Sequence, residues 1–148
     1  MNATVRDLPA AHAEVKAEIS RTDNKASLLL AFIGAVLAGV WSAGHDLPLT
    51  STVLASGLTG IALLLGAAAL LLSSVRPNLS GRHGFPLWAT LTPEQIRDAV
   101  ATDIAADIAG LSRIAVTKFT GLRRAIDLTR IGGLLLIATA VLALGGAA

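Results

Sequence analysis

The chain has no cysteine and no tyrosine among its 148 residues, and only 15% of its residues are charged. The absence of cysteine excludes disulfides, thiolate metal sites and a cysteine nucleophile. Charged side chains are also missing from three long runs, residues 26–43, 47–75 and 131–148. Because about 20 apolar residues in an α-helix cross a hydrocarbon core of about 30 Å, the sequence predicts three transmembrane helices.

Two other interpretations of these runs are disfavoured. A cleaved signal peptide has a short, positively charged start, whereas residues 1–25 precede the first run and include Asp7, Glu14, Glu18 and Asp23. We therefore expect the first run to be retained as a span. A soluble bundle rarely holds three such runs, and the mean hydropathy of +0.68 is high for one.

The basic residues predict how the chain is oriented. All twelve lie either before the first run or between the second and third runs. Basic residues close to spans are retained in the cytoplasm. We therefore expect a multi-pass membrane protein with its N-terminus in the cytoplasm and its C-terminus outside.

The segments between the spans are predicted to be helical. Thr92, Pro93 and Gln95 form a helix start with a capping box, and apolar residues then recur every three or four positions as far as Ile126. The sequence predicts that this helix runs unbroken into the third span, and that a weaker N-terminal helix packs against it. The poor helix formers Asp23 and Asn24 are expected to break that N-terminal helix below the bilayer.

The fold class expected is an all-α membrane protein with three transmembrane helices and long cytoplasmic helical extensions before spans one and three. Its predicted parts are a cytoplasmic helix (1–25), a transmembrane hairpin (26–75), a cytoplasmic loop and amphipathic helix (76–128) and a third transmembrane helix (129–148). Small residues four apart, such as Gly34 with Ala38 and Ser56 with Gly60, favour close helix packing. They do not decide whether it occurs within one chain or between chains.

No pattern for catalysis or cofactor binding is present. The three histidines, His12, His45 and His83, are scattered and lack metal-ligand spacing. Neither a Gly-x-Ser-x-Gly turn nor a glycine-rich phosphate loop occurs. We expect no enzyme activity, no cofactor, no metal and no nucleic-acid polymer as a partner.

Basic residues close to the spans are the main candidates for ligand binding. Arg21 and Lys25 are four apart before span one, where they can anchor the helix at the lipid headgroups. With Lys118, Arg123 and Arg76 they could also surround a polar pocket for a phosphate-bearing ligand. Local physical chemistry alone favours the anchor.

Residues 18–34 resemble the start of the Pycsar effector transmembrane family, with the core D-x-K-A-S-L-L at residues 23–29. The likeness extends through the hairpin, the exit from span two at Arg76 and Pro77, and residues 115–123. The resemblance implies a membrane effector in bacterial antiphage defence. Its charged motif falls on the following residues of this chain: Arg21, Asp23, Lys25, Lys118 and Arg123.

The resemblance also implies a mechanism. In such systems a cyclase makes a cyclic pyrimidine nucleotide on infection, cyclic UMP or cyclic CMP, and the effector then compromises the inner membrane. We therefore expect contacts with the lipid bilayer and with further copies of the chain, and a cyclic nucleotide as ligand, ending in growth arrest or cell death. The alternatives are a holin-like lysis protein, which would be encoded beside an endolysin gene, and a membrane scaffold or receptor subunit.

Overall fold

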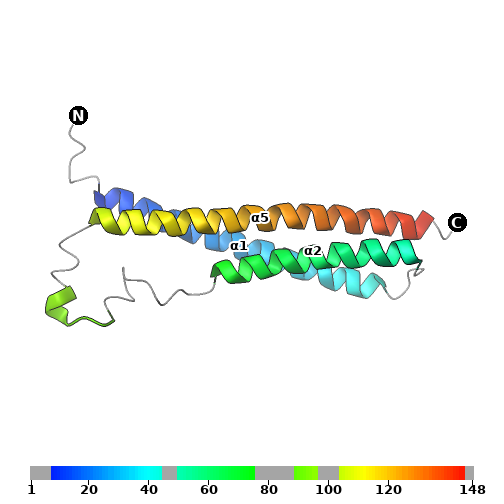
Figure 1. The fold of residues 1–148 in the computed structure, drawn as a ribbon, viewed down its shortest axis with the longest axis horizontal. Helices are drawn as coiled ribbons and strands as arrows, with labels where there is room; N and C mark the ends of the chain where they lie inside the picture. The colour runs from blue at the N-terminus through cyan, green and yellow to red at the C-terminus, as the bar shows by residue number, and fades with distance from the viewer. Residues whose placement is uncertain (1–7, 45–49, 76–88, 97–103, 146–148) are drawn as a thin grey trace, which may run out of the picture. The chain divides into compact units, whose positions relative to one another are not determined.

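The computed structural model describes residues 8–44, 50–75, 89–96 and 104–145. Three long helices account for most of them, α1 (Leu8–Ala43), α2 (Ser51–Val75) and α5 (Ile104–Gly145) (Figure 1). These described residues contain no strand. Each of the three helices is long and apolar enough to cross a membrane. The predicted all-α fold with three membrane-spanning helices is therefore confirmed.

The predicted break before span one is wrong, because α1 continues through Asp23 and Asn24 without interruption. Each of these residues costs only about 0.7 kcal/mol relative to alanine in a helix. Packing along the same helix acts in the other direction, since Ala26 is 3% exposed in an apolar core. A weak local preference is overridden by packing on the same helix.

Two helix starts carry side-chain caps, of which the one at Thr92 was predicted. The Thr92 backbone N–H donates to Gln95 Oε1 at 2.9 Å, and the Gln95 N–H donates to Thr92 Oγ1 at 3.4 Å, which confirms the capping box. Thr50 caps α2 through a 3.4 Å hydrogen bond from the Val53 N–H. Residues 93–96 are helical and α5 begins at Ile104. The stretch between them, over which the helix was predicted to be continuous, lies outside the described residues.

The chain divides into two compact units. Unit 1 consists of Met1–Asp23 and Arg76–Phe119, and unit 2 consists of Asn24–Val75 and Thr120–Ala148. Both α1 and α5 contribute to each unit, whereas α2 belongs to unit 2 alone. The domain boundaries expected from the sequence stay a prediction.

Unit 2 has a core built from all three helices. Ala26 and Ile33 of α1, Leu64 and Leu71 of α2 and Ala125 of α5 are each no more than 3% exposed and belong to one apolar cluster. Several core positions are alanine, whose small side chain lets helix backbones approach closely. Many large apolar side chains instead cover the outside, as expected for helices surrounded by lipid.

The α2 and α5 helices make a glycine contact within unit 2. A Cβ added to Gly132 would lie 3.0 Å from the Gly60 carbonyl oxygen and 3.1 Å from Leu63 Cβ. Farther along the two helices, a Cβ on Gly66 would lie 3.8 Å from Leu128 Cδ1. Small residues thus pack these two helices within one chain. Gly34 and Gly39 of α1, by contrast, have nothing within 4 Å of an added Cβ.

A hydroxyl pair joins the same two helices. Thr139 Oγ1 lies 2.8 Å from Ser56 Oγ and also 2.8 Å from the Leu135 carbonyl oxygen of its own helix. Ser56 Oγ in turn donates to the Thr52 carbonyl at 2.8 Å. Every hydroxyl in this pair therefore has a partner within its own helix as well as one across the interface.

Candidate functional site

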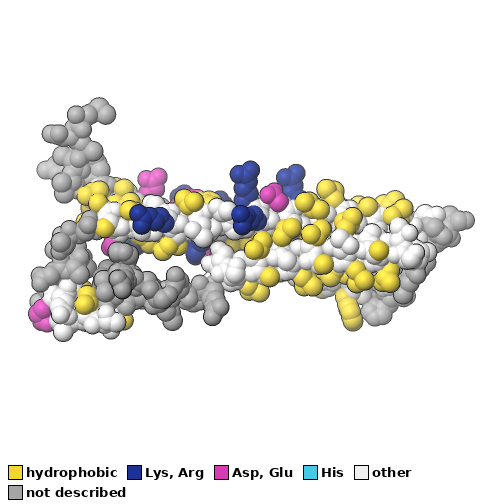
Figure 2. Space-filling view, in the orientation of Figure 1, with side chains coloured by type: hydrophobic (Ala, Val, Ile, Leu, Met, Phe, Trp, Pro, Cys, Tyr) yellow, Lys and Arg dark blue, Asp and Glu magenta, His cyan; other side chains and the backbone are white. Residues whose placement is uncertain are grey.

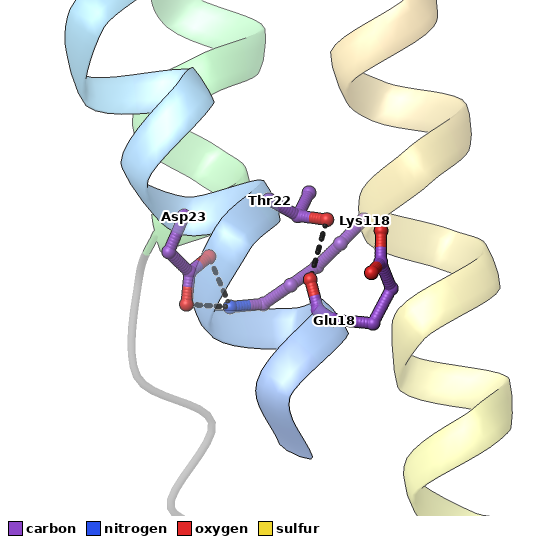
Figure 3. Close-up of polar contacts among 4 residues, drawn as sticks. All are labelled: Glu18, Thr22, Asp23 and Lys118. Carbon is purple, nitrogen blue, oxygen red and sulfur yellow. Dashed lines mark hydrogen bonds and ion pairs between the residues drawn. The ribbon is translucent and has the colours of Figure 1, made fainter. Parts of the chain in front are cut away.

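The central polar contact of unit 1 joins α1 to α5. Lys118 Nζ donates to both carboxylate oxygens of Asp23, at 2.6 and 2.8 Å (Figure 3). The Lys118 side chain is 20% exposed and that of Asp23 is 40% exposed. A charge-assisted bond to both oxygens, partly shielded from water, holds the ammonium group in one place. The lysine charge is compensated by this carboxylate within the chain.

Two further polar residues of unit 1 lie on α1 beside this pair. Thr22 is 2% exposed, and its hydroxyl donates to the Glu18 backbone carbonyl at 2.9 Å (Figure 3). The Glu18 carboxylate accepts a 3.1 Å hydrogen bond from Arg21, whose side chain is 70% exposed. An exposed pair of this kind contributes little to stability, since water screens it. It nevertheless balances the arginine charge locally.

The basic candidates of unit 2 have a different environment. Lys25 and Arg123 are both exposed, and the described part of the chain gives neither of them an ion-pair partner. Their immediate neighbours, Ala26 and Leu122, are buried in the same apolar cluster. Two exposed cations thus flank one core. Arg76, the remaining predicted residue, lies outside the described residues.

The structure therefore separates the predicted ligand-binding residues into those with an ion-pair partner and those without one among the described residues. The sequence did not indicate this difference. Arg21 pairs with Glu18 and Lys118 pairs with Asp23 within unit 1, whereas Lys25 and Arg123 of unit 2 have no ion-pair partner among the described residues. Asp23 and Lys118 are 95 positions apart, so no local spacing predicts their contact. Whether any of these residues binds a ligand stays a prediction.

Three further charged residues of α5 were not among the predicted site residues. Arg124, Asp127 and Arg130 are all exposed, and all belong to unit 2. Figure 2 shows basic and acidic side chains together over the middle of α5, whereas the C-terminal part shows hydrophobic side chains and no charged ones on this face. The spacing of Arg123, Asp127 and Arg130 at four and three residues was an available signal, because it places them on one helix face.

The described residues also form a recess, but its lining is not suited to binding a charged ligand. A recess of about 170 Å³ between the three helices of unit 2 is lined by apolar side chains such as Val40, Leu58 and Leu136, with Thr139 as the polar exception. No group of three or more metal-ligating side chains converges within the described ranges. A phosphate would find its positive charge at the helix surfaces rather than in this recess.

Comparison with known proteins gives one match. The model of a family described as the Pycsar effector protein domain matches residues 7–145, which is nearly the whole chain. No curated protein and no solved structure matches the chain. The family match includes both units and all three long helices.

Proposed function

The chain belongs to the Pycsar effector protein domain family, and we propose that it responds to a cyclic pyrimidine nucleotide by disrupting the membrane as an oligomer. Family membership makes it a membrane effector of Pycsar antiphage defence, and its three apolar helices bring it into contact with the lipid bilayer. The proposal concerns three steps of the mechanism: nucleotide binding, assembly of several copies of the chain, and loss of the membrane's permeability barrier. The result would be growth arrest or death of the infected cell.

We place the protein in the bacterial inner membrane, with the N-terminus in the cytoplasm and the C-terminus outside. The family match supports the bacterial membrane. The orientation is supported by the distribution of all twelve basic residues, which precede the first apolar run or lie between the second and third. Three spans place the two termini on opposite sides. The effector is proposed to act without catalysis.

The observation that carries the ligand proposal is the exposure of Lys25 and Arg123, two cations of unit 2. The nucleotide phosphate is proposed to bind these two cations of unit 2, since neither has a carboxylate partner among the described residues. Arg21, Asp23, Lys118 and Arg76 stay ligand-binding candidates from the sequence alone. To drive assembly, the ligand must bind the active state better, by about 1–3 kcal/mol per site for typical coupling.

The test is dye release from liposomes that contain the purified full chain. Addition of cyclic UMP or cyclic CMP should release trapped dye, while cyclic AMP should release much less. Lys25→Glu or Arg123→Glu should remove the response, because a carboxylate repels the phosphate. Arg113→Glu is the matched control, since this exposed arginine of unit 1 is outside the proposed site.

Two outcomes would count against the proposal. Release that ignores nucleotide would favour a holin-like protein, whose action depends on accumulation. An unchanged response in both glutamate variants, with normal membrane insertion, would mean that the phosphate binds elsewhere.

A further inference from the structure

A charged stripe on α5, made up of Arg123, Asp127 and Arg130, points away from the core of unit 2. At 100° per residue these three side chains fall within an arc of about 60°. Buried residues of the same helix, including Ala125, Gly132 and Thr139, lie on the opposite side. All three charged residues are exposed. The described elements of unit 2 therefore leave this charged stripe uncovered.

The contacts between α2 and α5 fix the level of this stripe along α2. Gly132 lies against Leu63 and Leu64, and Leu128 lies against Gly66. Arg130, between Leu128 and Gly132, is therefore level with Leu65. Leu65 is ten residues before the last residue of α2, a distance of about 15 Å along the helix.

The surroundings at this level are apolar. The α2 helix contains no charged residue, and it is about 37 Å long, more than the thickness of a hydrocarbon core. Leu65 and Leu72 are 55% and 58% exposed, as suits side chains that face lipid. The charged stripe of α5 thus lies at the depth of a lipid-facing part of α2. The charge-free runs of the sequence did not indicate that the charged stripe lies at this depth, because the third run begins only after Arg130.

Lipid alone is a poor environment for this stripe. A long arginine side chain can reach toward the headgroups, but the short side chain of Asp127 cannot. Charged residues at membrane depth normally face one another or a water-filled cavity. One chain supplies a single stripe, so a wall that encloses water needs further copies.

We propose that several copies of this chain place their charged stripes around a water-filled cavity that attracts anions. This inference rests on the proposed oligomer and adds its lining and its charge preference. Two arginines per aspartate leave the lining positive, and rings of arginine are typical of pathways for small inorganic anions such as chloride. The outer continuation of the same face is apolar, since Leu134, Ile137 and Val141 are 63–68% exposed. Such a segment suits a constriction that closes by excluding water.

The test uses the absence of native cysteine, which makes single-cysteine labelling free of background. Arg130→Cys and Leu65→Cys place a thiol at the same level on α5 and α2. The full chain in liposomes is treated with a water-soluble, anionic thiosulfonate, both without and with cyclic UMP. In at least one condition, Arg130→Cys should react within about tenfold of the rate of Arg113→Cys, and Leu65→Cys about 100-fold more slowly, because the thiolate reacts only where water reaches it.

Asp127→Cys tests a second position of the charged stripe and should also react rapidly with the thiosulfonate. If Arg130→Cys and Asp127→Cys react as slowly as Leu65→Cys in both conditions, the stripe faces lipid and the inference is wrong. Rapid reaction of Leu65→Cys would equally overturn it, because α2 would then not lie in hydrocarbon at this level. Labelling requires no dye release, so failure of the inference is distinguishable from failure of the proposed function.

Discussion

Lys118 and Lys25 have the same charge but differ in how that charge is balanced. Lys118 donates to both oxygens of Asp23, whereas Lys25 is exposed with no ion-pair partner in the described part of the chain. The sequence grouped them as equivalent cations, because both lie close to a span. A contact between residues 95 positions apart depends on how the helices pack, so the local spacing of charged residues does not predict it.

The Asp23–Lys118 pair should contribute measurably to stability. In detergent micelles, Asp23→Ala and Lys118→Ala should each lower the free energy of unfolding by about 1 kcal/mol, since partial exposure screens the pair. The double variant should cost less than the sum of the two, as expected for residues in contact. Denaturant unfolding followed by circular dichroism measures these values.

Arg21→Ala is the control for this cycle, because its pair with Glu18 is exposed and only three residues apart. It should change the free energy of unfolding by less than about 0.5 kcal/mol. Additive effects of the Asp23 and Lys118 substitutions would show that the contact is not formed in the folded chain.

The helices themselves were largely predictable from the sequence. The charge-free runs located three spans, and the signals at Thr92 and Gln95 correctly predicted a capped helix start. The expected break at Asp23 and Asn24 was wrong, because propensity is weak compared with packing along a long helix. The alignment of α2 with α5 was not predictable, since many glycines and alanines offer several similar registers.

Adjacent glycines on α5 offer a direct test of that alignment. Gly132→Val should lower the free energy of unfolding by about 2 kcal/mol, because its side chain would meet the Gly60 carbonyl and Leu63. Gly133→Val places the same side chain one position along, where nothing lies within 4 Å of the added Cβ. Its effect should stay within about 0.5 kcal/mol. Equal effects at the two positions would contradict the observed contact between α2 and α5.

At the scale of the whole molecule, the sequence predicted the membrane class and the family, and the family match includes residues 7–145. It did not predict which charged residues are compensated, nor that Arg130 is level with the middle of an apolar helix. Both depend on contacts between segments far apart in the chain.

The proposed orientation predicts opposite behaviour for reporters at the two ends. Alkaline phosphatase, which is active only outside the cytoplasm, should be active when fused after Ala148 and inactive when fused before Met1. A fusion after Ile96, between the second and third spans, is the control and should be inactive. Phosphatase activity of the fusion at Met1, without activity of the fusion at Ala148, would show that the chain has the opposite orientation.

The hydroxyl pair of Ser56 and Thr139 has a consequence for how easily α2 and α5 can part. Thr139 can donate either to Ser56 or to the Leu135 carbonyl, and Ser56 already donates to the Thr52 carbonyl. If the helices separate, each hydroxyl keeps a hydrogen bond within its own helix, and no polar group is left unpaired in lipid. The contact is therefore reversible at low energetic cost, which suits an interface that has to be remade when copies of the chain assemble.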